Sequence, residues 1–172
     1  MNLATWYLRR RYPRVLFGPG FRGPWRLRIR GAGRVSFGRD VRVSNTSGKT
    51  ALLTFSEGAS ITVGDRVTID GAGVMAASQI VIEEGAVLGP CLLVDTDFHA
   101  IGPERRMTGA EPSRRPIRIG RNAWVQAKAT VLKGVTVGDG AVVRWAAVVA
   151  SDVAPGSTVL GNPAVVESTT RR

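Results

Sequence analysis

A six-residue period between residues 119 and 154 constrains the fold of this chain more than any other feature. Six hexads in a row begin with Ile or Val, and the fifth place of each is Ala or Val; the first places are Ile119, Val125, Val131, Val137, Val143 and Val149. An amphipathic helix cannot produce this pattern, because its apolar stripe recurs every ~3.6 residues. Three hexads would close one triangular coil and stack Gly120 on Gly138. The period therefore predicts an all-β fold, a parallel β-helix built as a hexapeptide-repeat solenoid.

The same register recurs upstream with irregularities. Hexads fit at 63–67, 82–86 and 88–92, with Val94 opening the next one, and looser coils occupy 37–41 and 55–59. Between Ile69 and Ile82 the phase slips by one residue, and we place that slip at residues 79–81. Cys91, the only cysteine, lies in an apolar run and is expected to be a small core side chain.

Two segments break the repeat and define the predicted domain organisation. Residues 1–28 carry large aromatics and are interpreted as a basic N-terminal cap, since the ends of a solenoid need covering. Residues 100–118 are polar, contain three prolines and are predicted to be an excursion loop, and loops of that length are often functional. The β-helix is expected to span 29–166, followed by a C-terminal tail at 167–172.

Positive charge is concentrated at the N-terminus. The chain carries a net charge of +11, and residues 1–42 contain eleven arginines and one acid, Asp40. Nucleic acid, an anionic membrane surface or an acidic face of the protein itself could each match this charge. Trp6, Tyr7 and Leu8 beside Arg9–Arg11 would suit peripheral membrane contact, whereas nucleic acid is less favoured because no recognised motif accompanies the charge. A basic cap with solvated arginines is the plainest interpretation.

No apolar stretch approaches the ~20 residues of a membrane-spanning helix, and the N-terminus does not have the pattern of a secretory signal. A cytoplasmic location is therefore expected, with peripheral membrane association as the alternative.

Five strings resemble the hexapeptide-repeat acyltransferases that modify sugars and polysaccharides. In chain order they occupy 95–99 (DTDFH), 115–124 (RPIRIGRNAW), 133–143 (KGVTVGDGAVV), 151–155 (SDVAP) and 160–164 (LGNPA). The resemblance implies that the helix is left-handed and that the protein is a homotrimer with active sites between subunits. It also implies acetyl-CoA as the acyl donor and a sugar or glycan as the acceptor.

His99, the only histidine, stands where that family places its catalytic base. An imidazole with an ordinary pKa of ~6.5 can take a proton from a sugar hydroxyl near neutral pH, so that the hydroxyl attacks the thioester directly. Asp97 and Asp95 are candidates to orient His99 or to bind the acceptor, or else they are solvated corner carboxylates. Zinc enzymes of the carbonic anhydrase type share this fold, but their metal needs several histidines, so no metal is expected.

The coenzyme groove is the least regular part of the resemblance. The family has glycine-rich and alanine-rich corners where this chain has Gln126–Ala129 and Arg144–Ala147. Bulk at Trp145 could narrow the groove, or Lys128 and Arg144 could bind the coenzyme phosphates while Trp145 stacks on adenine. We favour the adapted groove. The predicted coenzyme-binding residues are Trp124, Ala127, Lys128, Lys133, Arg144, Trp145 and Ala146.

Trp124 could line the thioester end of the groove or pack at a subunit seam, and Lys133 is a weaker phosphate candidate. Arg171 and Arg172 could replace a basic residue that the family has after its Asn-Pro-Ala string. In the loop, Arg105, Arg106 and Arg114 are predicted to bind an anionic acceptor such as a nucleotide sugar, unless the loop is simply solvated.

Together these features predict an acetyl-CoA-dependent O-acetyltransferase acting on a carbohydrate hydroxyl. An N-acetyltransferase of an amino sugar and a non-catalytic trimeric scaffold or binding module remain open as alternatives.

Overall fold

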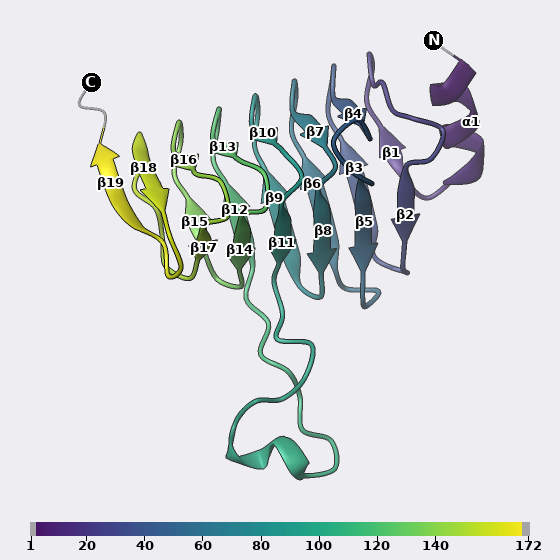
Figure 1. The fold of residues 1–172 in the computed structure, drawn as a ribbon. Coiled ribbons are helices and arrows are strands. Elements are labelled where there is room, and N and C mark those ends of the chain that lie inside the picture. Colours follow the sequence, from purple (N-terminus) through teal and green to yellow (C-terminus); the bar gives the residue numbers. More distant parts are fainter. Residues whose placement is uncertain (1–2, 170–172) are drawn as a thin grey trace.

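The computed structural model describes residues 3–169, and they form a three-sided solenoid of short parallel strands (Figure 1). The chain passes from face 1 to face 2 to face 3 in each coil, and corners join the faces. Face 1 contains β1 (Leu16–Phe17), β3 (Arg34–Phe37), β6 (Ser60–Val63), β9 (Gln79–Ile82), β12 (Ile117–Ile119) and β15 (Thr136–Val137). Face 2 contains β4 (Arg42–Ser44), β7 (Thr68–Asp70), β10 (Val87–Leu88), β13 (Trp124–Val125), β16 (Val142–Val143), β18 (Ser157–Leu160) and β19 (Val165–Thr169). Face 3 contains β2 (Arg28–Arg30), β5 (Ala51–Thr54), β8 (Gly73–Ala76), β11 (Leu92–Val94), β14 (Thr130–Leu132) and β17 (Val148–Val149).

The predicted hexad register is confirmed in the C-terminal coils. Ile119 pairs with Val137 on face 1, and Val125 pairs with Val143 on face 2. These first-place residues are almost fully buried, and so are the small fifth-place residues such as Ala123 and Ala129. The core is thus a column of aliphatic side chains inside the triangle. Gly138 shows how tightly the corners stack, because a Cβ there would lie 2.4 Å from the backbone nitrogen of Pro155.

The phase slip lies elsewhere than the sequence analysis placed it. Residues 79–81 belong to the regular strand β9, which pairs with β6 and β12, so the prediction was wrong. A regular coil places successive inward residues six positions apart. Here the inward residues Ile69 and Val74 are only five positions apart, whereas Val74 and Ile82 are eight apart. The short connection turns at Gly71 with φ +75°, and the long one takes up its extra residues at the turn 77–78 between β8 and β9.

The register of the next coil also differs from the expectation. The regular register predicts Leu92 (fifth place of one hexad) and Val94 (first place of the next) as inward residues. Instead, Cys91 and Leu93 point inward and are 5% and 0% exposed. The face-2-to-face-3 connection is again one residue short here, so the pattern moves by one position. Cys91 does lie in the core, which confirms that prediction.

A short helix, α1 (Leu3–Arg11), covers the N-terminal end of the solenoid (Figure 1). It buries Leu8 and Thr5, and the Thr5 hydroxyl donates to the carbonyl of Phe21. Behind it, the Tyr12 hydroxyl donates to Leu27 O and accepts from Ile29 N–H on the edge strand β2. The solenoid begins inside the segment 1–28 that was predicted to be the cap, because β1 already pairs with β3.

The opposite end is covered by the chain turning back on itself. Strand β19 runs antiparallel to β18 and extends to Thr169, into the predicted tail. Next to it, Val148 of β17 donates to Gly161 O and accepts from Ala164 N–H. Arg171 and Arg172 lie outside the described residues. Within residues 3–169, no helix is long and apolar enough to cross a membrane.

Candidate active site

The excursion loop leaves the solenoid between β11 and β12, at the corner joining face 3 to face 1, and projects away from the body (Figure 1). It contains one short 3-10 helix, η1 (Pro103–Arg106). The loop returns at Ile117, which is 1% exposed and already part of β12, so residues 117–118 belong to the solenoid rather than to the loop as predicted.

The two ends of the loop form a narrow neck. Asp97 N–H donates to Ser113 O, Arg115 N–H donates to Asp95 O, and Thr96 and Arg114 form an antiparallel bridge. These contacts fix the backbone of residues 95–97, the segment that leads to His99. The neck therefore gives the candidate catalytic residues a defined position although they lie outside the repeat.

Asp95 is fully buried beneath the neck and holds the preceding coil. Its carboxylate accepts hydrogen bonds from Ala77 N–H at 2.6 Å and from Ser78 N–H at 2.8 Å. These are the donors at the turn where the β8–β9 connection is two residues longer than a regular corner. Both carboxylate oxygens are thus occupied by backbone, which gives Asp95 a structural role in this geometry.

Asp97 has one engaged and one unengaged carboxylate oxygen. Its Oδ1 lies 2.5 Å from Nζ of Lys133, which stands at the same corner one coil further on, and the two side chains are 17% and 19% exposed. Asp97 Oδ2 is buried and has no hydrogen-bond partner among the described residues. A buried acceptor left without a donor costs about 1–3 kcal/mol, so a donor from a ligand or a neighbouring group would be favoured there.

His99 follows a strained turn. Phe98 has φ +62°, a conformation that bulky residues rarely adopt, and its N–H donates to the Thr96 hydroxyl. Its ring packs edge-on against Phe55 at a centroid distance of 5.4 Å. His99 N–H donates to Asp97 O, and its side chain is exposed to solvent. The turn thus leaves His99 accessible to solvent, with its backbone bonded to that of Asp97.

The candidate coenzyme residues gather at a different corner, the one joining face 2 to face 3. Lys128 N–H donates to Pro90 O, and Ala146 N–H donates to Ala127 O, so three successive corners stack in a column. Lys128 and Ala146 have φ values of +60° and +58°. Glycine adopts such positive φ values without steric cost, and glycine is the residue expected at these corners from the family resemblance.

Trp145 lies on the outside of that column and does not fill it. Trp145 is 60% exposed, Nζ of Lys128 lies 5.0 Å from the centroid of its ring, and its backbone N–H donates to Gln126 Oε1. The Arg144 guanidinium pairs with Glu167 of β19 at 2.8 Å. Lys128 therefore keeps a cation facing an aromatic ring, whereas Arg144 is already neutralised by a carboxylate.

The remaining candidates are dispersed. Trp124 is 47% exposed on the outer side of face 2. Lys133 pairs with Asp97 and is not part of the column that contains Lys128 and Trp145, which argues against a phosphate role. Within one chain, face 3 separates the His99 corner from the Lys128 corner. One copy of the chain thus does not bring the two halves of the predicted site together.

The loop arginines differ from one another. Arg114 pairs with Glu111, whereas Arg105 and Arg106 are exposed and form no ion pair with a described side chain. Arg115, the fourth arginine of the segment 100–118, lines a hollow of about 530 Å³ beside the neck on face 1. In that hollow, hydrogen bonds to Glu83 raise the pKa of Arg118 above its ordinary value. The only available signal for Arg115 was its place at the return of the loop.

No group of three or more His, Cys, Asp or Glu side chains gathers as a metal site in the described part of the chain.

Comparison with known proteins connects this geometry to the acetyltransferases. No protein-family model matches the chain. Nodulation protein L of Rhizobium meliloti is 36% identical over 93 residues, which cover 54% of this chain and 50% of the relative. The chain spans about half the length of the first curated relatives it matches.

Among solved structures, a variant of AntD, an N-acyltransferase from Bacillus cereus, superposes with a TM-score of 0.72 at 17% identity, covering 91% of this chain and 83% of that one. It was solved in complex with dTDP-4-amino-4,6-dideoxyglucose and coenzyme A. A hexapeptide-repeat acetyltransferase from Vibrio cholerae, complexed with acetyl coenzyme A, gives a TM-score of 0.59 at 21% identity and covers 97% of this chain and 76% of that one.

The chain therefore has the fold of the hexapeptide-repeat acetyltransferases, a left-handed parallel β-helix. The predicted fold class is confirmed.

Proposed function

We propose that this protein is an acetyl-CoA-dependent O-acetyltransferase that acts on a carbohydrate hydroxyl. The observation that carries the proposal is the neck of the excursion loop: it fixes Asp97, one of whose carboxylate oxygens is buried and unengaged, and it leads two residues later to the exposed His99. The structural neighbours solved with acetyl coenzyme A or coenzyme A, an acetyltransferase and an N-acyltransferase, support the reaction class.

His99 acts as the general base. An imidazole nitrogen takes the proton of the acceptor hydroxyl while the hydroxyl oxygen bonds to the thioester carbonyl carbon. The carbon–sulfur bond then breaks, and the departing coenzyme thiolate takes the proton from the imidazolium. Atoms and charges balance without a covalent enzyme intermediate. Asp97 Oδ2 accepts a hydrogen bond from the imidazole or from a second acceptor hydroxyl, and Lys133 holds Asp97 in place.

The active site is shared between copies of the chain in a homotrimer. The reason is the separation of the His99 corner from the Lys128 corner by face 3, which leaves each half incomplete in one copy. At the Lys128 corner, the side chains of Ala127 and Ala146 leave backbone accessible for the pantetheine arm. Lys128 and Trp145 bind the phosphates and the adenine, and Trp124 contributes from the outer side of face 2.

Arg105 and Arg106 on the loop, with Arg115 at its base, bind an anionic acceptor such as a nucleotide sugar. AntD was solved with a nucleotide-linked amino sugar, so N-acylation of an amino sugar is a second candidate. A screen that contains both neutral sugars and amino sugars distinguishes the two reactions.

The first experiment is a titration of acetyl-CoA into the purified chain by calorimetry, with thermal unfolding alongside. Ligand at 100-fold over Kd should stabilise the folded state by about 2.7 kcal/mol. Absence of binding at millimolar acetyl-CoA would instead support a non-catalytic scaffold.

Release of coenzyme A thiol then measures turnover. His99→Ala should lower kcat by roughly 10²–10⁴-fold and leave acetyl-CoA affinity unchanged. Arg121→Gln, an exposed cation away from both corners, serves as the matched control. A His99→Ala variant with unaltered kcat would refute the catalytic role.

Co-expression of two inactive variants tests the shared site. His99→Ala and Lys128→Glu alter different corners, so a mixed trimer should contain at least one site with both intact halves and regain part of the activity. If each chain contained a complete site, the mixture would stay inactive.

A further inference from the structure

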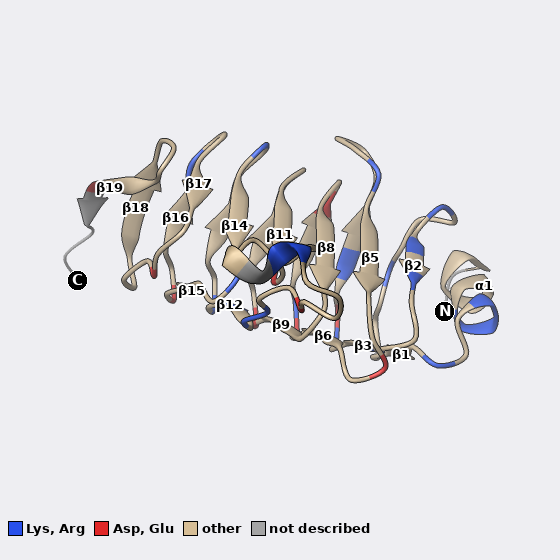
Figure 2. Ribbon diagram, turned by 90° about the horizontal axis from the view of Figure 1, so that it is seen from below, with Lys and Arg blue, Asp and Glu red and all other residues tan. Residues whose placement is uncertain are grey.

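The N-terminal end of the solenoid has an unusual excess of unpaired positive charge. All eleven arginines within residues 1–42 are exposed, and among the described residues only Arg39 forms an ion pair, with Asp65. Elsewhere in the described residues half of the arginines, Arg66, Arg114, Arg118 and Arg144, are each paired with a carboxylate, whereas Arg105, Arg106, Arg115 and Arg121 are not. Figure 2 shows α1 and β2 with basic residues and no acidic ones. This end therefore presents a positive field that the protein does not neutralise internally.

The same end exposes apolar side chains. Leu3 and Leu16 are each 70% exposed, and Trp6 and Trp25 are 49% and 51% exposed. Helix α1 turns Leu8 toward the solenoid, which leaves Trp6 and Arg10 on its outward side, with the guanidinium 5.5 Å from the indole centroid. At this end of the solenoid an aromatic and a cationic side chain, Trp6 and Arg10, are thus in direct contact.

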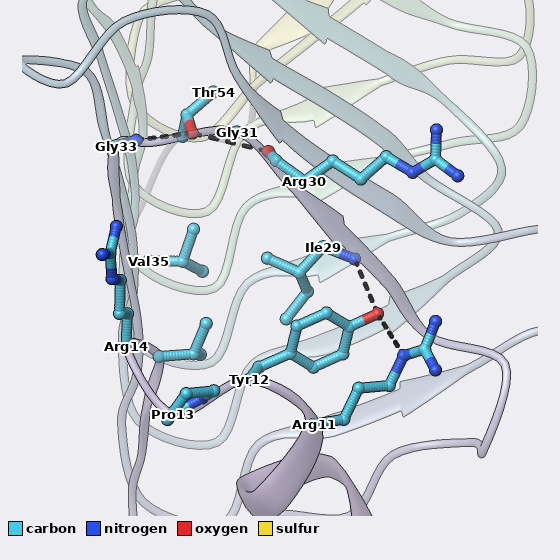
Figure 3. Close-up of a pocket in the computed structure, with 11 residues that line it drawn as sticks. Arg11, Tyr12, Pro13, Arg14, Ile29, Arg30, Gly31, Gly33, Val35 and Thr54 are labelled. Carbon is cyan, nitrogen blue, oxygen red and sulfur yellow. Dashed lines mark hydrogen bonds between the residues drawn. The ribbon is translucent and has the colours of Figure 1, made fainter.

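The cations on this surface do not converge on one point. A pocket of about 260 Å³ opens behind α1, with Ile29 and Val35 in its lining (Figure 3). Figure 3 shows the guanidinium groups of Arg14 and Arg30 on opposite sides of it, pointing away from each other. Arg11 is engaged by the hydroxyls of Tyr7 and Tyr12. Such an arrangement suits an extended anionic surface better than one small anion.

We propose that this cap surface, defined by Leu3, Trp6, Arg10, Arg14, Leu16 and Trp25, binds an anionic lipid membrane. Arginine side chains are attracted electrostatically to anionic headgroups. Leucine and tryptophan side chains bury apolar area when they enter the interface between headgroups and acyl chains. A single-stranded nucleic acid could use the arginines and the tryptophans. It would leave the exposed Leu3 and Leu16 unused, and so the membrane is favoured.

This inference does not depend on the proposed enzymatic function. The cap surface lies at the N-terminal end, whereas the loop with His99 leaves from the middle of the solenoid (Figure 1). A catalytically inactive His99→Ala variant should bind membranes as the unmodified chain does, so failure of one proposal does not imply failure of the other.

Co-sedimentation of the full chain with vesicles tests the proposal. Vesicles of phosphatidylcholine alone are compared with vesicles that also contain phosphatidylglycerol, at low and at high salt. The chain should bind the mixed vesicles much more tightly, and added salt should weaken that binding because it screens the charges.

Two variants and one matched control define the surface. Replacing Arg10 and Arg14 by Gln should weaken partition roughly 25-fold, since each arginine near the headgroups contributes about fivefold. Replacing Leu3 and Trp6 by Ser should weaken it about tenfold with the charge unchanged. The control, Lys49→Gln with Arg121→Gln, removes two exposed cations from elsewhere and should have little effect.

Equal weakening by the control pair would overturn the proposal, as would failure to bind phosphatidylglycerol vesicles at low salt. A fluorescent single-stranded oligonucleotide provides the remaining comparison. If the oligonucleotide bound through Arg10 and Arg14 while vesicles did not bind, the surface would be a nucleic-acid site instead.

Discussion

Lys133 Nζ lies 2.5 Å from Asp97 Oδ1, across the corner where the excursion loop leaves the solenoid. The contact joins residues 36 positions apart in sequence and connects the neck of the loop to the next coil. Asp97 is thereby fixed on one oxygen while the other remains available. This ion pair is the most specific connection between the repeat and the candidate catalytic segment.

Breaking the pair from either side should destabilise the fold. Lys133→Met leaves a mostly buried carboxylate unpaired and should cost about 2 kcal/mol, less than the ~3–5 of a fully buried pair because both side chains retain some exposure. Asp97→Asn should cost less, since the amide can still accept a hydrogen bond. Urea unfolding of both single variants and the double variant measures the coupling between them. Strict additivity of the two effects would show that the contact contributes nothing to stability.

Asp95→Ala should be among the most destabilising single changes at the site. It leaves the N–H groups of Ala77 and Ser78 without their acceptors, at about 1–3 kcal/mol each. Asp95→Asn keeps one acceptor oxygen and should lose roughly half as much. Thermal unfolding measures both effects. If Asp95→Asn instead abolished turnover without lowering the melting temperature, Asp95 would have to contact the reacting groups.

Asp70 should make stability depend on pH in the acid range. Its partial burial raises the pKa of the carboxyl. Hydrogen bonds donated by Ser44, Ser47 and Thr46 together lower the pKa by more than burial raises it, so the folded pKa lies below the ordinary value. A depressed pKa stabilises the fold above the unfolded value of ~3.9, and this contribution is lost as pH falls through the folded pKa.

The comparison with Asp70→Asn isolates that contribution. The difference in unfolding free energy between the two proteins should be constant above about pH 5 and shrink on further acidification. Unfolding by urea at a series of pH values measures it. A difference that stayed the same down to the acid limit would mean that the carboxylate does not titrate with folding.

Cys91 should resist alkylation in the folded protein. Its thiol is 5% exposed, and burial raises its pKa to about 12. At pH ~8.5, where half of an ordinary cysteine is thiolate, almost none of Cys91 should react with iodoacetamide. Mass spectrometry before and after denaturation in urea provides the measurement. Rapid labelling of the native chain would show that the face-2-to-face-3 corner opens at Cys91.

The C-terminal coils could be predicted residue by residue because each hexad there carries its own signal. Ile119, Val125 and Val131 repeat at constant spacing, and one corner resembles the next. The irregular coils could not be predicted in this way. The connection shortened at Gly71 and the connection lengthened at 77–78 nearly cancel in their effect on the spacing of the apolar residues. Only strand pairing reveals where each change lies. Leu93 was misassigned for the same reason, because Leu92 and Val94 are equally apolar.

The candidate residues of the site could be chosen from the sequence, but their contacts could not. His99 could be identified as the only histidine, placed just before the loop. The pairing of Asp97 with Lys133 depends on how the neck stacks on the next coil, and Asp95 owes its burial to two extra residues in the coil before it. The left-handed turn at Phe98 had no sequence signal, since nothing in the residue type favours it.

The coverage of the two solenoid ends has a further consequence. A stack of parallel strands offers a fresh row of amide and carbonyl groups at each end, and such rows are templates for fibril growth. Here Tyr12 bonds both Leu27 O and Ile29 N–H at one end, and Gly161 and Ala164 engage Val148 at the other, beside the reversed strand β19. Side chains and a turned-back strand occupy the positions where another molecule would add. Covering these edge groups works against end-to-end polymerisation of the solenoid.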